Sequence, residues 1–254
     1  MLLAIDAGNT NVTIGVFDGS NLQTSWRLRT IREQTTDEWG ILLRSLFRVG
    51  ELDPRIITGV AIASVVPPLD LQLAEMSRRY FRCEAVFVNV DVKLGLEVVI
   101  DNPREAGADR LANAAAAFHK YGGPCVVVDM GTAINFDVIS DSGQFLGGII
   151  CPGIGIAISG LFEKAARLPL VDFREPRKLI GTNTVDCIQS GLYYSTISTI
   201  DGILARLLAE LGENTKVVAT GGQAKLIVAG SKFLNTVDED LTLDGVRLIW
   251  ERNV

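Results

Sequence analysis

The sequence predicts an α/β protein made of two related lobes, mainly because one short pattern occurs twice. Residues 4–18 and residues 127–138 each read as an apolar strand that ends in aspartate, a glycine turn with hydroxyl or amide side chains, and a second strand. Further short strands and crossover helices follow in each half, which is typical of α/β layers. Hydrophobic residues make up 48% of the 254 residues, so the chain can build a full core.

The first half is expected to begin with three short strands joined by Asn/Gly turns, at residues 2–7, 12–18 and 22–29. Thr35 and Glu38 then have the spacing of a capping box, and apolar residues follow at helical period. The continuous apolar run 57–66 suits a buried parallel strand. Pro67-Pro68 is expected to end that strand, and a helix is expected near residues 69–81.

The first half is expected to end with two short strands, a polar loop and an alanine-rich helix, at residues 86–90, 96–100, 101–110 and 111–121. Gly122-Gly123-Pro124 is the best linker candidate, because the strand–turn–strand pattern restarts directly after it. We therefore expect one lobe over residues 1–122 and a second lobe over residues 123–254. Two such lobes would leave a cleft between them.

The second half is expected to contain four strands, at residues 125–129, 134–140, 144–150 and 216–220. Helices are expected near residues 154–167, over 184–211 as one or two segments, shortly after Gly222, and at 243–251. Residues 142–162 carry no charge and are long enough to cross a membrane. Six glycines and Pro152 in that stretch favour a buried strand, a glycine loop and a helix start, so no membrane segment is expected.

Charge and cysteine usage exclude several classes of protein. A net charge of −6 and a pI near 4.9 argue against a nucleic-acid or membrane-surface role, which usually needs basic patches. A phosphate ligand remains compatible with this charge, because metal ions and backbone N–H groups bind phosphate. The spacing of the four cysteines fits no zinc motif, and the N-terminus lacks the features of a signal peptide. We therefore expect a cytoplasmic protein with small, buried thiols.

The two aspartate–glycine turns are the strongest candidates for chemistry. Asp6 is expected at a strand end, where ligands bind in open α/β sheets, and Gly8 would let the backbone approach a phosphate closely. A single such turn is equally well explained as an ordinary hairpin. The second copy, at Asp129, Gly131 and Thr132, favours two half-sites around one metal–phosphate ligand.

Two further segments carry weaker signals. Gly221 and Gly222 lie between an expected strand and helix, where they could admit a base or a phosphate, or simply form a tight turn. Asp109 and Arg110 are expected in the first turn of a helix, where an aspartate often only complements the helix dipole. Asp109 is nevertheless the best candidate base, since the single histidine, His119, is interpreted as a helix-end residue.

Six segments together resemble the type III pantothenate kinases, which belong to the acetate kinase/sugar kinase/Hsp70/actin superfamily. They occur in the family's order over nearly the whole chain, at residues 6–11, 101–110, 129–132, 147–153, 181–184 and 220–222. The segment that contains Asp109 and the Asn183-Thr184 segment are specific to this kinase type, whereas the paired aspartate turns indicate only the superfamily. The resemblance implies duplicated ribonuclease-H-like, actin-like ATPase lobes.

The resemblance also implies roles for individual residues. The first phosphate loop would consist of Asp6, Ala7, Gly8, Asn9, Thr10, Asn11, Val12 and Thr13, with Asp6 helping to hold Mg²⁺-ATP. The second lobe would bind a monovalent cation, K⁺ or NH₄⁺, at Asp129 and would contact ATP through Thr132, Gly221 and Gly222.

On the side of the acceptor, the resemblance implies that Asp109 accepts the proton of the pantothenate hydroxyl and that Arg110 pairs with the pantothenate carboxylate. Gly107 and Ala108 belong to the same substrate segment. Thr184 would reach pantothenate from the partner protomer of a homodimer. The family commonly has tyrosine where this chain has Ile100, so one hydrogen-bond donor to the substrate is lost and apolar lining is kept.

The activity implied is transfer of a phosphoryl group from ATP to pantothenate, the first step of coenzyme A biosynthesis. Three alternatives stay open at the level of sequence. The chain could be a non-catalytic nucleotide-binding regulator of the same fold, although Asp6, Asp109 and Asp129 are intact. It could be a kinase of another small hydroxy acid or polyol, which Ile100 would allow. An ATPase like actin or Hsp70 fits less well, because 254 residues leave little room for the extra subdomains.

Overall fold

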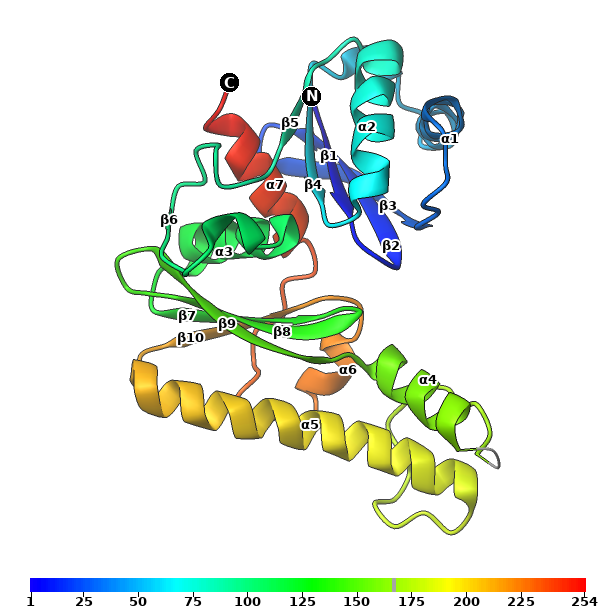
Figure 1. Ribbon diagram of the computed structural model, residues 1–254, viewed down its shortest axis with the longest axis vertical. Coiled ribbons are helices and arrows are strands. Elements are labelled where there is room, and N and C mark those ends of the chain that lie inside the picture. The colour runs from blue at the N-terminus through cyan, green and yellow to red at the C-terminus, as the bar shows by residue number, and fades with distance from the viewer. Residues whose placement is uncertain (166–167) are drawn as a thin grey trace. The chain divides into compact units, whose positions relative to one another are not determined.

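The computed structural model describes residues 1–165 and 168–254 and divides the chain into two compact units (Figure 1). Unit 1 comprises Met1–Lys120 together with Asp240–Val254, and unit 2 comprises Tyr121–Glu239. The sequence analysis placed the end of the chain in the second lobe, whereas the structure groups it with unit 1. The reason is packing, because the last helix, α7 (Leu241–Glu251), contacts three strands of the unit 1 sheet.

The unit 1 sheet has the strand order β3-β2-β1-β4-β5. The strands are β1 (Leu2–Ala7), β2 (Asn11–Asp18), β3 (Asn21–Arg29), β4 (Gly59–Ser64) and β5 (Ala85–Phe87). The short strand β6 (Glu97–Val98) follows along the chain and is not part of this sheet. The first three strands form antiparallel pairs, as the Asn/Gly turns predict, while β4 runs parallel to β1 and β5 runs parallel to β4. The β-strand that ends in Asp6 is therefore central and buried.

Helices cover both faces of the unit 1 sheet. They are α1 (Thr36–Val49) and α2 (Pro67–Met76) together with α7. Unit 1 also contains α3 (Ala108–Tyr121), a π-helical turn at Ser77–Phe81 and 3₁₀ turns at Pro54–Ile56 and Pro103–Glu105. Trp39, Leu43 and Leu73 of α1 and α2 join the apolar cluster with the strands β1, β2 and β4. On α7, Leu243 lies against Gly15 of β2.

Local signals in the sequence explain where α1 and α2 begin. The predicted capping box is confirmed, because Glu38 and Thr35 exchange hydrogen bonds at the start of α1. The prolines do not simply end the preceding strand. Pro67 and Pro68 occupy the first turn of α2, where the missing N–H group of proline has no helical partner in any case, so the helix starts earlier than predicted.

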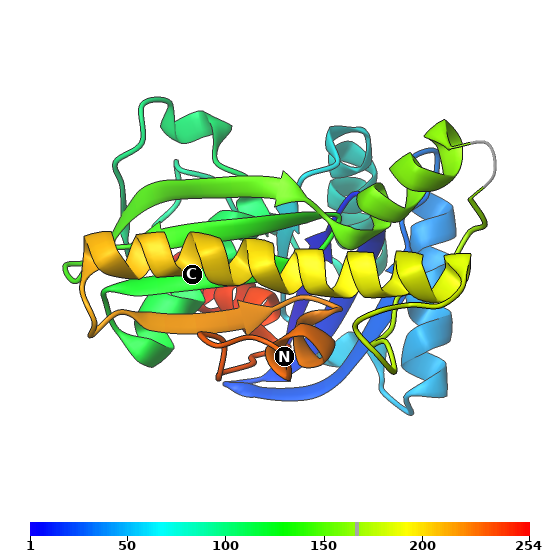
Figure 2. The same ribbon diagram turned by 90° about the horizontal axis from the view of Figure 1, so that it is seen from below.

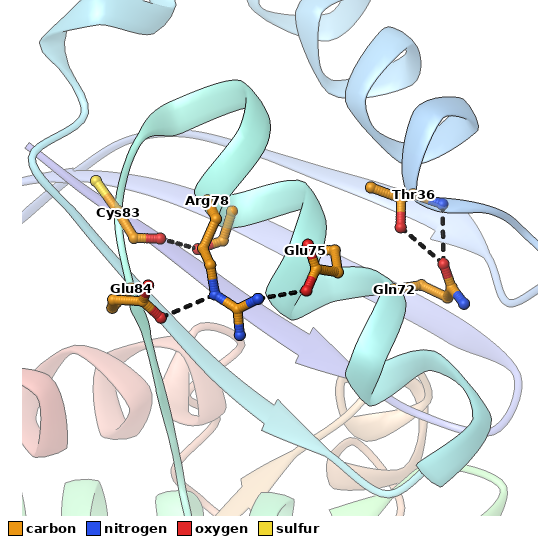
Figure 3. Close-up of polar contacts among 7 residues, drawn as sticks. Thr36, Gln72, Glu75, Arg78, Cys83 and Glu84 are labelled. Atoms are coloured by element: carbon orange, nitrogen blue, oxygen red, sulfur yellow. Dashed lines mark hydrogen bonds and ion pairs between the residues drawn. The ribbon is translucent and has the colours of Figure 1, made fainter.

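Polar contacts tie α2 to its surroundings (Figure 3). The side-chain oxygen of Gln72 accepts hydrogen bonds from the Thr36 amide at 3.1 Å and from the Thr36 hydroxyl at 2.7 Å, which joins α2 to the first turn of α1. Beyond the end of α2, Arg78 pairs with Glu75 and with Glu84. These ion pairs are solvent-exposed, so they contribute little to stability, whereas the Gln72 hydrogen bonds join α2 directly to the start of α1.

The unit 2 strands follow the order β10-β7-β8-β9. They are β7 (Cys125–Met130), β8 (Ala133–Ile139), β9 (Gln144–Pro152) and β10 (Lys216–Thr220), with antiparallel pairs β7–β8 and β8–β9 and a parallel pair β10–β7. This order repeats that of β4-β1-β2-β3 in unit 1. The duplication that the sequence predicts is therefore present in the topology of the two sheets.

The long segment 184–211 is a single helix, α5 (Thr184–Leu211), which runs along one face of the unit 2 sheet (Figure 2). Tyr193, Ile197 and Ile200 of α5 pack in the same apolar cluster as the strands β7 and β8. Helix α4 (Ile154–Lys164) contacts α5, and α6 (Ala224–Val228) follows β10. The predicted helix near 154–167 thus ends at Lys164, and residues 166–167 lie outside the described residues.

The charge-free stretch 142–162 forms β9, a glycine connection and most of α4, as predicted. The strand itself is not buried as expected, because Leu146 and Ile150 of β9 are exposed. Within residues 1–165 and 168–254, none of the helices combines the length and apolar character that crossing a membrane requires.

The prediction that all four cysteines are buried is correct only for Cys125. Burial raises the pKa of the Cys125 thiol to about 12, so this group stays protonated at neutral pH. Cys83 and Cys151 are half-buried, and Cys187 at the start of α5 is exposed.

The high alanine content of α3 is explained by its packing against α7. A side chain at Gly245 of α7 would lie 1.9 Å from the backbone oxygen of Ala112, so α7 and α3 approach at backbone distance. Small residues on both helices permit that approach. Since α3 carries Asp109 in its first turn, α7 supports the helix that presents the candidate base.

We predict that Gly245→Ala lowers the free energy of unfolding by about 1–3 kcal/mol, because the backbones of α3 and α7 must move apart. The matched control is Gly202→Ala in α5, where the added methyl group meets only the end of the Arg206 side chain, at 3.6 Å. This control should gain about 0.5–1 kcal/mol from helix propensity. Urea unfolding monitored by circular dichroism measures both, and equal effects of the two substitutions would contradict the close packing of α3 and α7.

Candidate active site

The first aspartate turn lies at the end of β1 in unit 1. Asp6 is opposite Thr13 in the antiparallel pair with β2 and opposite Ala63 in the parallel pair with β4. The aspartate is half-buried, whereas the tip of the turn, residues 9–11, is exposed. The turn therefore presents its backbone and polar side chains to solvent beyond a central strand.

Hydrogen bonds hold this turn in one shape. The Gly8 amide donates to the Asn11 carbonyl oxygen at 3.0 Å, and the Thr30 hydroxyl donates to the Gly8 carbonyl oxygen at 2.6 Å. The Thr30 amide donates in turn to the carbonyl oxygen of Thr10 at 3.0 Å. These contacts fix the loop from the end of β3, so its backbone is held in one conformation.

The substrate segment predicted from the sequence lies in unit 1 as well. It forms the 3₁₀ turn Pro103–Glu105 and the first turn of α3. Asp109 is half-buried, and its Oδ1 accepts a hydrogen bond from the Arg110 amide at 2.8 Å. Burial raises the pKa of the Asp109 carboxyl, and the hydrogen bond from the Arg110 amide offsets only part of that effect. A carboxyl with a raised pKa is a better proton acceptor, which suits a general base.

Gly107 makes room for that carboxyl. A side chain at Gly107 would lie 2.5 Å from Oδ1 of Asp109 and 3.6 Å from the Val65 side chain. The Val65 amide donates to the Ala7 carbonyl oxygen at 3.0 Å. Val65 therefore links the first aspartate turn to the segment that carries the candidate base, through contacts inside unit 1.

Candidate substrate residues line two cavities. One, of about 710 Å³, lies in unit 2, and the other, of about 700 Å³, lies in unit 1. The unit 1 cavity is bordered by the junction between β4 and α2, by residues 87–91 and by residues 104–108, which include Gly107 and Ala108. One polar group in its wall is Asp70, which accepts a hydrogen bond from the Ser64 hydroxyl at 2.5 Å. Ile100 is half-buried and is not part of this wall.

The second aspartate turn lies at the end of β7 in unit 2. The Gly131 amide donates to the Ala133 carbonyl oxygen at 2.9 Å, and Gly131 and Thr132 are exposed. Gly153, which precedes α4, donates to the Thr132 carbonyl oxygen at 3.1 Å. A side chain at Gly153 would lie 2.2 Å from that oxygen, so α4 begins directly against the turn.

The structure brings Gly221 to the second aspartate turn. Gly221 has a φ of +91°, and a side chain there would lie 2.7 Å from Oδ1 of Asp129. Gly222 follows and is exposed. Sequence reasoning gave the Gly-Gly pair only a weak signal, because it could not show that the pair adjoins Asp129.

Thr184 is the first residue of α5 and lines the unit 2 cavity. Asn183 caps the helix, since its Oδ1 accepts a hydrogen bond from the Asp186 amide at 2.9 Å. Ala157 and Leu161 of α4 also line this cavity, and sequence reasoning did not assign them to a site. The only signal in the sequence was the unusual lack of charge in residues 142–162.

Asp6 offers a divalent metal one carboxylate as a ligand. Among the described residues, no group of three or more His, Cys, Asp or Glu side chains could hold a metal ion by itself. Mg²⁺ usually keeps several waters and binds through one or two carboxylates together with substrate phosphates. A single carboxylate at the end of a strand beside an exposed polar turn, as at Asp6, fits that mode of binding.

The repeated sheet topology places the chain in the class of proteins with the actin-like ATPase and sugar kinase fold. A ROK family glucokinase from Streptomyces griseus, solved with glucose and AMPPNP, superposes with a TM-score of 0.52 at 11% identity, covering 98% of this chain and 99% of that chain. The ethanolamine utilization protein EutJ from Carboxydothermus hydrogenoformans superposes with a TM-score of 0.57 at 14% identity, covering 97% and 89% of the two chains. These similarities confirm the predicted fold class.

Sequence comparison then gives the particular family. The family model for type III pantothenate kinase matches residues 2–206. The type III pantothenate kinase of Solibacter usitatus is 62% identical over 253 residues, covering 100% of this chain and 97% of that protein. The enzyme of Koribacter versatilis is 52% identical over 263 residues, covering 100% and 96%. The chain belongs to the type III pantothenate kinase family, which confirms the predicted resemblance.

We predict that Asp109→Asn stabilises the protein at neutral pH and not in acid. The pKa of the Asp109 carboxyl is raised in the folded state, so its contribution to the free energy of unfolding depends on pH. That stabilising contribution is fully present below the unfolded-state pKa of about 3.9, and it is lost as pH rises through the folded-state pKa. Asparagine stays neutral and can still accept the hydrogen bond from the Arg110 amide. The difference in the free energy of unfolding between variant and wild type should therefore widen as pH rises.

Urea titrations between about pH 4 and about pH 7.5 measure this difference. The control is Asp141→Asn, which changes an exposed aspartate in the turn between β8 and β9. A constant difference between Asp109→Asn and wild type across that range would show that the Asp109 carboxyl is not penalised by burial.

Proposed function

We propose that this protein phosphorylates pantothenate with ATP to give 4′-phosphopantothenate, the first step of coenzyme A biosynthesis. The observation that carries the proposal is the placement of Asp109: a half-buried carboxyl with a raised pKa, in the first turn of α3, in a chain of the type III pantothenate kinase family. The segment directly before it, Gly107-Ala108, lines a cavity large enough for a small hydroxy acid.

In this proposal the hydroxyl oxygen of pantothenate attacks the γ-phosphorus in line, and the bond to the β-phosphate oxygen breaks. Asp109 accepts the hydroxyl proton, which needs a distance of about 3 Å in the reacting complex. Arg110 pairs with the carboxylate of pantothenate, since its planar guanidinium can donate two parallel hydrogen bonds. Ile100 lies outside the wall of the unit 1 cavity, so no contact with pantothenate is assigned to it there.

The same proposal assigns the nucleotide to the two turns. Residues 6–13 hold the phosphates through backbone amides and the Thr10 hydroxyl, and Asp6 helps to hold the divalent metal that comes with ATP. Thr132, Gly221 and Gly222 contact the nucleotide from unit 2. When bound, the divalent metal neutralises phosphate charge. Alignment and charge stabilisation supply most of the catalysis in such a transfer.

We further propose that Asp129 binds a monovalent cation, K⁺ or NH₄⁺. Asp129 lies near the end of β7, beside the exposed residues Gly131 and Thr132, which carry backbone and hydroxyl oxygens. Oxygen donors are the ligands that such hard cations prefer. A protein with a net charge of −6 also needs added positive charge next to bound phosphates.

A homodimer is the assembly that we propose. Tyr193, Ile197 and Ile200 of α5 lie in the apolar core of unit 2, and Leu192 is buried as well, so this part of α5 is an internal helix. Exposed apolar side chains lie instead on the elements around the unit 2 cavity. They are Ile156, Leu161 and Phe162 of α4, Leu179 and Ile180, and Val185 and Tyr194 of α5. Exposed apolar side chains of this number mark an interface.

In the dimer, Thr184 of one protomer would complete the pantothenate site of its partner. Thr184 lines the unit 2 cavity and is exposed at the start of α5, among those apolar side chains. An isologous twofold contact would place two equivalent sites at one interface. We propose a cytoplasmic location, where ATP is available.

The first test is release of ADP with and without pantothenate. We expect turnover that depends on pantothenate, and Asp109→Asn should lower kcat by about 10²–10⁴, because a general base is removed. Asp141→Asn serves as the control and should keep wild-type turnover. ADP release that does not depend on pantothenate would favour a generic ATPase. ADP release only with another hydroxy acid would show that pantothenate is not the substrate. Wild-type kcat in folded Asp109→Asn would contradict the role of the base.

The second test compares turnover in K⁺, NH₄⁺ and Na⁺ at fixed Mg²⁺ and ionic strength. We expect K⁺ or NH₄⁺ to activate and Na⁺ to fail, and Asp129→Asn should lose the response because it removes the carboxylate charge. Equal rates in all three salts would reject the cation role of Asp129.

The third test is complementation in mixed dimers. An Asp109→Asn protomer and a Thr184→Trp protomer should each be inactive alone. If sites are shared, one site in each heterodimer combines wild-type Asp109 with wild-type Thr184, so part of the activity should return. Absence of recovery, despite demonstrated subunit exchange, would show that Thr184 does not act in the partner's site.

A further inference from the structure

We propose that Gly221 is a positioning residue: its lack of a side chain lets the Asp129 carboxylate rest against the turn after β10, so that the cation and the nucleotide bind to one rigid unit. This inference rests on the proposed roles of Asp129 and Gly221. It adds a physical link between them that neither role requires.

The link begins with strand register. Strands β7 and β10 are parallel neighbours, and Thr220 is paired with Asp129. The two strands therefore end at the same level of the sheet, and the residues that follow them leave it side by side. Thr220 and Met130 are buried, so neither strand end can shift freely.

The contact at Gly221 is close on two sides. A side chain there would lie 2.7 Å from Oδ1 of Asp129, and equally 2.7 Å from the backbone nitrogen and carbon of Met130. The carboxylate could swing away, but the Met130 backbone belongs to a central strand and could not. Any side chain at position 221 would thus push the whole turn, with Gly222, away from Asp129.

A second glycine borders the same carboxylate. A side chain at Gly131 would lie 3.9 Å from Oδ1 of Asp129, which is ordinary van der Waals contact. The turn after β10 and the turn after β7 thus enclose one carboxylate, but only Gly221 must lack a side chain for this arrangement to exist.

Coupled binding follows from this geometry. A cation that orders the Asp129 carboxylate also orders the turn that contacts the nucleotide, and the reverse holds by thermodynamic reciprocity. Couplings of this kind typically change affinity by about 5–150-fold. We expect K⁺ to tighten the binding of nucleotide by an amount within that range.

The chain offers a matched control for the test. Gly212, at the end of α5, has a φ of +96°, close to that of Gly221, but no atom lies within 4 Å of the position of an added side chain. Gly212→Ala and Gly221→Ala therefore both place a side chain at a positive φ, but only Gly221→Ala displaces the turn from Asp129.

The experiment measures the Kd of AMPPNP·Mg²⁺ by calorimetry with and without KCl, with ionic strength held constant by tetramethylammonium chloride. Wild type and Gly212→Ala should bind at least about fivefold more tightly with K⁺. Gly221→Ala should lose most of that dependence. The same K⁺ dependence in all three proteins, or none in wild type although K⁺ activates turnover, would overturn the inference and leave the cation role of Asp129 standing. No effect of K⁺ on binding or on turnover would instead reject the cation role.

A measurement on the wild type covers the case in which Gly221→Ala does not fold. Hydrogen exchange of the peptide that contains residues 219–223 is followed with K⁺ alone, without nucleotide. We expect slower exchange with K⁺ than with tetramethylammonium. Unchanged exchange, in a protein whose turnover K⁺ activates, would show that the cation does not order the nucleotide turn and would overturn the inference.

Discussion

In each unit, one pair of parallel strands determines which distant chain segments meet beside the candidate site residues. The aspartate-bearing strands β1 and β7 lie inside their sheets, where β1 pairs in parallel with β4 and β7 pairs in parallel with β10, the edge strand of its sheet. Parallel neighbours bring their carboxyl ends to the same edge, where chain segments far apart in sequence meet. That is why Val65 reaches Ala7 in unit 1 and Gly221 reaches Asp129 in unit 2.

The candidate site residues also depend on segments whose backbones approach each other closely, and glycine permits this approach at two positions. Gly153 sets the start of α4 against the Thr132 carbonyl oxygen, and Gly245 sets α7 against α3. At these positions a methyl group would collide with backbone, which cannot yield as a side chain end can. The two aspartate turns and the helix of the candidate base are therefore held by contacts that tolerate very little change.

Electrostatics distinguishes the carboxylates of the proposed site. Asp109 is penalised by burial, so its pKa is raised and it is suited to accept a proton. Asp6 and Asp129 stand at strand ends beside exposed turns, where cations and phosphates can reach them. The proposed division into one proton acceptor and two cation-binding groups follows from these surroundings rather than from residue type, which is aspartate in all three.

The sequence by itself determined the repeated strand–turn–strand pattern, the capping box of Thr35 and Glu38, and the family, because these depend on neighbours in the chain or on motif order. It also singled out Asp109 in the first turn of α3. It misjudged the start of α2 and the lobe that α7 joins, since either outcome satisfies the local pattern. Only the tertiary structure decided that Leu192 and Ile200 are core residues, that α4 lines a cavity with Thr184, and that Gly221 lies against Asp129. Those facts depend on which surfaces meet across a sheet, and periodicity along one segment carries no information about its partner.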